Sequence, residues 1–488
     1  MIPWQGFLPV RALALTVLAL AVLPIASATA AETATHSANT QHLKNLPYEQ
    51  RNADGSPNYG TDLEFATIRG REYSVAGSYE NGMHIVDITR PANSRVVGKY
   101  DCDILQGDVQ IFTQEQRPGR TFATYTADAF GNEGSACYQQ AEAIGFDAID
   151  ETRSPGARGK QGTFIADITS PSNPRTVSFV EIPQGSHNQT VHPSGDYLYN
   201  SNSDLITSFQ PAIEVFDIRT LDRPKKIAEV ALPPRPGLGT ESHDITFNED
   251  GSRGYSAALS QGIILNTEDP ANPSVLTSFL DPTINVWHQS DPVTIGDREF
   301  LVVEDEFAGA AGGPVCPNGG VHIYEITGEM ELDPQKVGYW NIDDARPTTT
   351  PDGRCTAHVF DIHEEEQLMT IAYYNGGVRV VDISGLEGIS LGDTNLQGEG
   401  MRQLGFYRFT NSDTWAVKAP RIEADGSFHM YGNDINRGFD VYRFTGAEDP
   451  SVPAGTMMTP LQAATHLQTR NRPKLTAGNR MFCLLDSN

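Results

Sequence analysis

The sequence GMHIVDITRPANSRV at residues 82–96 decides the fold, because the chain repeats it. Each copy holds a β-rich run that ends in Asp-Ile or a close equivalent, and the fullest copies continue into a proline-containing turn and a second β-rich run. The clearest further copies are GTFIADITSPSNPRT at 162–176, AIEVFDIRTLDRPKK at 212–226 and YNGGVRVVDIS at 374–384, with weaker ones at 262–275 and 319–327. One such unit cannot bury its own apolar face, so the recurrence predicts an all-β array of stacked units.

The spacing of the copies leaves room for four strands in each of seven units. Units of roughly 40–50 residues with four strands are typical of β-propellers. We therefore expect a seven-bladed β-propeller over residues 31–446, with insertions at 129–160 in the second blade and 309–320 in the fifth. The seventh unit lacks its outer strand, and an open ring would expose an unpaired sheet edge. Residues 39–49 are predicted to close the ring, whereas a solenoid would need capping units that the sequence lacks.

The first thirty residues have the pattern of a secretory signal. Arg11 precedes the apolar run LALTVLALAVLPIA, and the small residues SATAA follow it. The run is short for a membrane span, so we expect a signal peptide at 1–30 and no transmembrane segment in the mature chain. This predicts an exported protein of the periplasm, the cell surface or the extracellular medium.

Five cysteines are readable as disulfides if the protein is exported. Cys102 and Cys137 bracket two strands and the start of an insertion, and Cys316 and Cys355 bracket another two-strand stretch, so we expect these two pairs. Cys483 is left over. The polar segment 447–488 that contains it is expected to be a poorly ordered tail.

The charge balance is strongly acidic. The chain has 35 Lys and Arg against 62 Asp and Glu, a formal net charge of −27. Such a surface repels phosphate backbones, which argues against nucleic acid as a partner. The partner class that remains is an unidentified protein or small molecule bound on one propeller face.

The repeats resemble a known family. The V/I-x-I-V-D-I strands followed by S/T-x-P-x-N-P are similar to the LVIVD-repeat proteins, over most of residues 40–446. That resemblance implies an exported bacterial protein with a propeller fold. It implies no particular activity, because the family has no settled one.

One column of residues stands out when the innermost strands are aligned. The pieces GTDLEFA, QGDVQIF, GSHNQTV, ESHDITF, VWHQSDP, TAHVFDI and DTWAVKA share a position near their N-terminal ends. That position holds Asp62, Asp108, His187, His243, His288, His358 and Trp415. Inner strands surround the central channel of a propeller, so these side chains are expected to form a ring around its mouth.

Neutral imidazoles with carboxylates nearby suit a divalent transition metal, here Zn, Cu or Fe. We predict a metal site made by the four column histidines, with Asp62, Asp108 and Glu304 as additional ligands. His192 and His363 lie five residues further on and should point to the other strand face. The alternative is that the polar ring lines a wet channel and binds nothing.

The recurring aspartates Asp87, Asp167, Asp217 and Asp382 are interpreted as structural, because a short carboxylate at a strand end accepts backbone N–H groups and fixes the following turn. Three functional hypotheses remain. The first is a binding or interaction platform with a His-rich metal site, and the second is a metal-dependent enzyme of oxidase or hydrolase type that uses the same histidines. The third is a structural module of the cell envelope with an empty polar channel.

Overall fold

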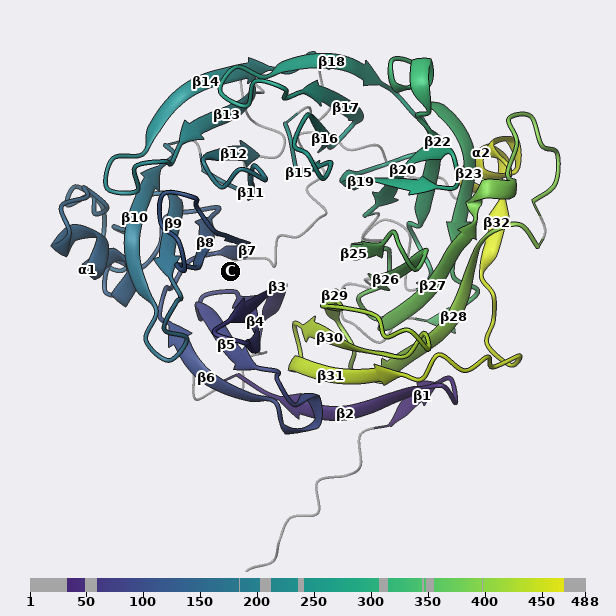
Figure 1. The fold of residues 1–488 in the computed structure, drawn as a ribbon, viewed down its shortest axis with the longest axis horizontal. Coiled ribbons are helices and arrows are strands. Elements are labelled where there is room, and N and C mark those ends of the chain that lie inside the picture. Colours follow the sequence, from purple (N-terminus) through teal and green to yellow (C-terminus); the bar gives the residue numbers. More distant parts are fainter. Residues whose placement is uncertain are drawn as a thin grey trace, which may run out of the picture. The chain divides into compact units, whose positions relative to one another are not determined.

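The computed structural model contains seven antiparallel blades arranged around a central axis (Figure 1). It describes residues 33–48, 59–183, 185–201, 212–235, 241–306, 315–344, 346–347, 355–396 and 398–468. The chain divides into two compact units, Met1–Thr33 and Ala34–Asn488, and all seven blades belong to the second. The predicted seven-bladed propeller is confirmed. The predicted signal peptide at 1–30 and Cys483 lie outside the described residues.

The first four blades are continuous in sequence, and their strands run outward from the axis in chain order. The first blade is β3 (Gly60–Ile68), β4 (Arg71–Ser78), β5 (Met83–Asp87) and β6 (Arg95–Tyr100). The second is β7 (Gln106–Phe112), β8 (Phe122–Ala127), β9 (Gly162–Asp167) and β10 (Arg175–Glu181). The third is β11 (Asn188–Val191), β12 (Tyr197–Ser201), β13 (Ala212–Asp217) and β14 (Lys225–Ala231). The fourth is β15 (Asp244–Phe247), β16 (Arg253–Ala258), β17 (Gln261–Asn266) and β18 (Ser274–Phe279).

The last three blades also contain strands from the two ends of the chain. The fifth is β19 (Trp287–Ile295), β20 (Arg298–Asp305), β22 (Val321–Glu325), β23 (Gln335–Asn341) and β32 (Thr456–Met458). The sixth is β25 (His358–His363), β26 (Leu368–Ala372), β27 (Val378–Gly385), β28 (Gly400–Phe409) and β1 (Ala34–His36). The seventh is β29 (Thr414–Lys418), β30 (Phe428–Asp434), β31 (Gly438–Phe444) and β2 (Thr40–Leu46). Outside the blades lie β21 (Val315–Cys316) paired with β24 (Arg346–Pro347), helices α1 (Ala136–Ala143) and α2 (Pro460–Gln468), and the 3-10 turns Pro91–Asn93, Gly328–Glu331 and Leu386–Gly388.

Apolar side chains between neighbouring blades form the core. Val75 and Ile85 of the first blade pack in one buried cluster with Tyr125 and Phe164 of the second. A single four-stranded sheet has no partner for such faces, so each blade depends on its neighbours for burial. This dependence explains why the repeats close into a ring.

The repeated aspartates have the structural role predicted for them. A carboxylate oxygen of Asp167 accepts the backbone N–H of Thr169 at 2.9 Å, and Asp382 accepts that of Ser384 at 2.9 Å. Asn266, which replaces the aspartate in the fourth blade, accepts the N–H of Glu268 at 3.0 Å in the same way. The same bond forms at Asp87 and Asp217, so these side chains fix the turn after the third strand in blades one, two, three, four and six.

Ring closure follows the prediction made for residues 39–49. Strand β2 pairs antiparallel with β31 from Thr40 opposite Phe444 to Leu46 opposite Phe439, and thereby becomes the outer strand of the seventh blade. In Figure 1, β2 lies beside β31 although they are at opposite ends of the blade-forming chain. Strand β1, which no sequence pattern indicated, adds a fifth strand to the sixth blade by pairing with β28.

Both predicted disulfides are present. Cys102 is bonded to Cys137, which lies in helix α1 of the insertion 129–160, and Cys316 is bonded to Cys355. We expect the Cys102→Ala/Cys137→Ala double variant to lose about 2–4 kcal/mol of unfolding free energy, because the bond constrains a long loop of the unfolded chain. Urea unfolding would measure this. An unchanged midpoint with an intact native bond in the parent would contradict the prediction.

The segment after the last blade differs from the prediction of a disordered tail at 447–488. Residues 456–458 form β32, which pairs with Tyr339–Asn341 of β23, and Ala463 and Leu467 of α2 pack against Tyr339. The expectation was therefore wrong for the described part of this segment, because apolar side chains in a polar stretch have a blade edge to cover. Residues 469–488 lie outside the described part of the chain.

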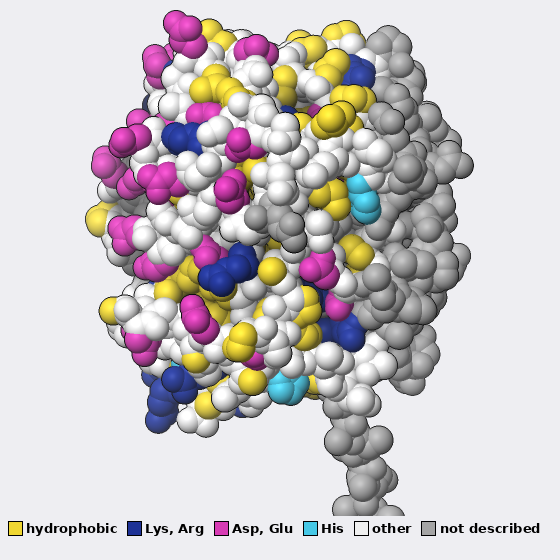
Figure 2. All heavy atoms as spheres, turned by 90° about the vertical axis from the view of Figure 1, so that its right-hand side faces the viewer, with side chains coloured by type: hydrophobic (Ala, Val, Ile, Leu, Met, Phe, Trp, Pro, Cys, Tyr) yellow, Lys and Arg dark blue, Asp and Glu magenta, His cyan; other side chains and the backbone are white. Residues whose placement is uncertain are grey.

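The side of the ring that carries β32 and α2 is shown in Figure 2, where acidic side chains outnumber basic ones among the atoms drawn in colour. This is the surface expected from the net charge of −27. Within the described ranges, helices are all too short or too polar to cross a membrane.

Candidate metal centre

The structure brings the four column histidines together in one row. They come from the inner strands, or the residue just before them, of the third to sixth blades. The ring centroids are 4.3 Å apart for His187 and His243, 4.0 Å for His243 and His288, and 4.4 Å for His288 and His358. All four side chains are buried, and His288 is the most exposed at 3%. Four buried imidazoles, each in ring contact with the next, are a set of nitrogen donors that suits a metal ion.

Two of the imidazoles donate a hydrogen bond to a backbone carbonyl of the next blade. Nδ1 of His243 donates to the carbonyl oxygen of His288 at 3.1 Å, and Nδ1 of His358 donates to that of Trp415 at 2.5 Å. A carbonyl can only accept, so each proton must sit on Nδ1. In the neutral ring the lone pair is then on Nε2, the atom that would bind a metal.

The other two imidazoles use carboxylates for the same purpose. Nδ1 of His187 lies 3.1 Å from both oxygens of Asp128, which follows strand β8. Nδ1 of His288 contacts Oε1 of Glu304 in β20. Three rings thus have a hydrogen-bond partner at Nδ1, and the fourth contacts a carboxyl oxygen through the same atom. Such outer support of the ring nitrogen is what metal-binding histidines usually have.

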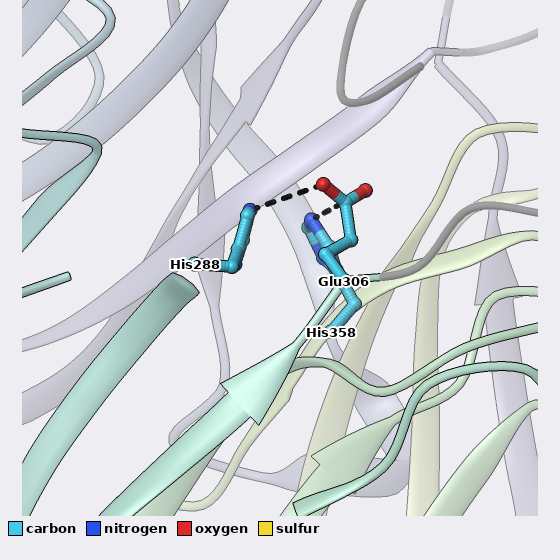
Figure 3. A group of neighbouring side chains, drawn as sticks. All are labelled: His288, Glu306 and His358. Carbon is cyan, nitrogen blue, oxygen red and sulfur yellow. Dashed lines mark ion pairs between the residues drawn. The ribbon is translucent and has the colours of Figure 1, made fainter. Parts of the chain in front are cut away.

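A carboxylate faces the Nε2 atoms of two of these rings. Oε2 of Glu306 lies 3.7 Å from Nε2 of His288, and Oε1 lies 3.7 Å from Nε2 of His358 (Figure 3). The ligand atoms of the three residues all lie within 4.8 Å of one another, and the three side chains are buried. Ligands about 2.1 Å from a zinc or similar ion would be about 3.4 Å apart in tetrahedral geometry. The trio therefore fits a transition metal with a small inward adjustment.

Tyr374 holds the third member of this trio. Its hydroxyl donates to Oε1 of Glu306 at 2.7 Å, and its ring lies 4.5 Å from that of His358. Tyr374 has a φ of 45°, a strained conformation for a residue with a side chain. Leu259 occupies the corresponding position after the second strand of the fourth blade with a φ of 51°. The positive φ is therefore a feature of the blade fold at this position, whereas the hydroxyl group that contacts Glu306 is specific to Tyr374.

Asp62 and Asp108 are not in the histidine column, which corrects the alignment of the first two blades by one residue. Thr61 donates from Oγ1 to the carbonyl of Gly107 at 3.1 Å, the same blade-to-blade bond that His243 makes to His288. The column therefore holds Thr61, Gly107, His187, His243, His288, His358 and Trp415. Both inner strands have a β-bulge at this point, and polarity alone does not reveal its register.

The displaced aspartates have other partners. Asp62 pairs with Lys418 at 2.9 Å, and Asp108 accepts from the backbone and side-chain nitrogens of Gln189. Asp62 and Asp108 line the same central cavity as His243 and His288, on other blades. Glu304 supports a ring nitrogen on the far side from the trio, so it is an outer partner and Glu306 is the facing carboxylate.

His192 and His363, which were predicted to point to the other strand face, lie away from the row. Nε2 of His192 contacts the carbonyl of Gly251 at 3.0 Å, and His363 pairs with Asp361 at 3.3 Å. Neither side chain joins the row, as expected for residues an odd number of positions away from the column, which point to the opposite face of the strand.

The central cavity has a volume of about 450 Å³ and receives side chains from all seven blades. His243 and His288 form part of its wall, so the row is reachable from it. The polar side chains that line it further along the inner strands are Asp62, Glu64, Asp108, Gln110, Asn188, Thr190, Asp244, Thr246, Gln289, Asp291, Asp361 and Lys418.

Burial controls the protonation of the site. Burial and the neighbouring imidazoles hold the pKa of His243 well below its usual value, and burial also lowers the pKa of His288. Burial, followed by Asp305 and Asp244, raises the pKa of Glu304 well above that of a free carboxyl group. At neutral pH these two histidines are therefore neutral, the form that binds metals.

Sequence reasoning missed three of the residues that complete the site. Glu306, Asp128 and Tyr374 each directly follow or lie one or two residues beyond the second strand of a blade. The one sequence signal for these residues was their position just after a second strand. Second strands run antiparallel to the inner strands and therefore end at the edge of the ring where the histidines lie.

Comparison with known proteins gives no family. No protein-family model matches the sequence, and no curated protein matches it. Among solved structures, the chain is similar to the β-propeller domain of Cps50 (Swd1) from Myceliophteria thermophila, with 9% sequence identity, a TM-score of 0.45, and coverage of 79% of this chain and 96% of that one. The fold of the chain, a seven-bladed β-propeller, is therefore assigned from its own strand topology.

Proposed function

We propose that this protein is an exported propeller that binds one divalent transition-metal ion at its axis through His288, His358 and Glu306, and that it acts as a binding platform around that centre. The observation that carries the proposal is the buried trio with its two Nε2–carboxylate distances of 3.7 Å. Two imidazoles and one carboxylate suit zinc, iron or copper. His243, in ring contact with His288, is a fourth donor within reach.

Export and the LVIVD relationship belong to the same proposal. The two disulfides Cys102–Cys137 and Cys316–Cys355 suit an oxidising compartment. The repeated V-D-I strands with proline turns support membership of the LVIVD-repeat proteins. An exported metal-binding platform fits both features.

The chain's own residues prepare the site in three ways. Backbone carbonyls fix Nδ1 as the protonated nitrogen of His243 and His358, and Tyr374 holds Glu306 with its oxygens toward the rings of His288 and His358. The wall of apolar blade contacts keeps water away from one side. A bound ion would act as a Lewis acid there and lower the pKa of a coordinated water.

A metal-dependent enzyme is the second candidate. It is favoured by the cavity of about 450 Å³ whose wall includes His243 and His288, because a catalytic metal needs an open coordination position. Cobalt-loaded protein would separate the two candidates. An enzyme is expected to show a changed cobalt visible spectrum when imidazole is added, and a closed binding site is not.

Metal analysis of the purified protein tests the main proposal. We expect one transition-metal ion per chain in the parent, and at least about 100-fold weaker binding in each of His288→Ala, His358→Ala and Glu306→Ala, because ligand loss exceeds the effect of losing a supporting residue. His192→Ala is the matched control, since that histidine is also largely buried but lies outside the row. Equal metal content in the parent and Glu306→Ala would overturn the proposal.

A further inference from the structure

An apolar plug closes the central cavity at the end where the histidine row lies. It consists of the buried cluster Tyr79, Leu259, Val286, Tyr374, Trp415, Ala416 and Ile435, with Tyr59, Leu105 and Val359 packed against it. These residues come from every blade except the third. Tyr59 and Leu105 directly precede inner strands, whereas Tyr79 and Ile435 directly follow second strands. Because those strands are antiparallel, all of these positions meet at one edge of the ring.

Exposure rises from the plug toward the opposite end of the cavity. The buried members of the plug are at most 4% exposed, and the histidine row is at most 3% exposed. Three residues further along the inner strands, Glu64, Gln110, Thr246, Asp361 and Lys418 are all partly exposed. The cavity therefore opens at the end away from the plug, and His288 lies near its closed end.

The wall of the cavity is acidic between its opening and the histidines. The described lining residues include six carboxylates and one ammonium group, which are Asp62, Glu64, Asp108, Asp244, Asp291, Asp361 and Lys418. Lys418 is already neutralised, because it pairs with Asp62 at 2.9 Å and with Glu64 at 2.6 Å.

Three of the remaining carboxylates of the wall, Asp108, Asp244 and Asp291, accept hydrogen bonds from neutral donors. The fourth, Asp361, also pairs with His363 at 3.3 Å, outside the lining. Asp291 accepts from the hydroxyl of Thr246 at 2.7 Å, and Asp361 accepts the backbone N–H of Ala419 at 3.1 Å. Burial raises the pKa of Glu64 and Asp291 to about 7 and that of Asp108 well above its usual value, so the wall gains negative charge as the pH rises above neutral. A low-dielectric wall of one sign concentrates ions of the opposite sign and repels ions of the same sign.

We infer that, in the described part of the ring, the histidine row is reached through one acidic opening, which admits small cations and neutral polar molecules and excludes anions. The functional meaning of this selectivity rests on the proposed metal centre, since the metal ion would enter as a cation by this route. It also restricts any substrate of that centre to a cationic or neutral polar molecule small enough for about 450 Å³. Phosphate esters and carboxylates would be rejected before they reached the imidazoles.

Fluorescence quenching of Trp415 tests the inference without any metal, because this indole lines the cavity beside the row. Subtracting the emission of Trp415→Phe isolates its signal from that of the other tryptophans. At pH 8.5, above the pKa of about 7 to which burial raises Asp291, we expect strong quenching by caesium and by neutral acrylamide and only weak quenching by iodide. In Asp291→Asn/Asp361→Asn, the iodide quenching constant should rise at least about threefold, as wall charge is removed.

Two further variants make the result specific. Asp222→Asn/Glu151→Gln removes the same charge from exposed positions of the outer surface and should leave the iodide constant unchanged. Gln110→Tyr/Thr246→Tyr narrows the opening and should lower quenching by acrylamide at least about threefold, because both positions lie on the route. Iodide quenching that is equal in the parent and the Asp291/Asp361 variant overturns the charge selection, and unchanged acrylamide quenching in the narrowed variant overturns the single opening. If both results hold but no metal binds, only the proposed function fails.

Discussion

Replacing Asp440 with alanine is expected to lower the unfolding free energy by about 3–5 kcal/mol, because it leaves a buried arginine without its charge partner. Asp440 is fully buried in β31, and its oxygens accept from Nε and Nη2 of Arg437 at 2.7 and 2.9 Å. The same carboxylate also accepts from His42 at 2.7 Å and Asn45 at 3.0 Å, both in the closing strand β2. One side chain thus joins the last blade to the strand that closes the ring.

Urea unfolding at neutral pH measures this loss, and two variants show its origin. Asp222→Ala, in an exposed pair with Arg223, should leave the midpoint unchanged. Adding Arg437→Met to Asp440→Ala should recover part of the loss, because the buried guanidinium that has lost the Asp440 carboxylate is removed. A midpoint for Asp440→Ala equal to that of the parent would contradict the expectation.

The contribution of Asp440 should also depend on pH in a defined direction. Burial alone would raise its pKa, but hydrogen bonds from His42 and Arg437 outweigh that effect and hold the pKa below its usual value. A carboxyl group with a lowered folded-state pKa stabilises the protein above its unfolded pKa of about 3.9, and the stabilisation is lost as the pH falls. The difference in stability between Asp440→Asn and the parent should therefore shrink below about pH 4.

A chain that begins at residue 49 is expected not to fold, which is the second large effect. It lacks β2, whose pairing with β31 completes the seventh blade, and it lacks Leu43, Leu46 and Tyr48, which pack in one cluster with Tyr431 and Val441. Burying each such apolar side chain contributes about 1.5–3 kcal/mol. Together with the lost Asp440 contacts, the lost stabilisation is comparable to the whole unfolding free energy of a typical domain, which is about 5–15 kcal/mol.

Size-exclusion chromatography and near-ultraviolet circular dichroism would reveal the outcome of this truncation. A chain that begins at residue 33 is the control and should remain folded and monomeric-sized, because it retains β1 and β2. A synthetic peptide of residues 33–48, added to the shorter chain, should restore the native signal, and a scrambled peptide should not. A cooperative, stable ring from residue 49 onward would show that closure is dispensable.

The fold was predictable because its signal is repeated. One copy of V-D-I followed by a proline turn is weak, but several copies at blade spacing leave only a circular or linear array, and the incomplete seventh unit favoured the circle. The strands β1 and β32 were not predictable, since each is only three residues long and pairs with an existing blade edge. Such short additions are determined by the edge that they cover and not by their own sequence.

The candidate site was predictable in its histidines and not in its carboxylates. His187, His243, His288 and His358 share one position of a repeat, so fold symmetry alone brings them together. Glu306 lies beyond the end of β20, where the chain leaves the regular strand, and an acidic chain offers many equivalent candidates. The alignment of Asp62 was off by one residue, because polarity placed the aspartate in the column in place of the threonine before it. The bulge at this point is not the cause, since β19 has the same bulge beside the correctly aligned His288.

The pairing of β2 with β31 has a consequence for how the molecule is made. His42 and Asp440, which meet in the finished ring, are 398 residues apart in sequence. At the usual translation rate of 5–20 residues per second, about 20–80 s pass between the synthesis of β2 and that of its partner β31. The nascent protein therefore spends its synthesis as an unclosed chain, and a chain in that condition can still be threaded through a translocation pore.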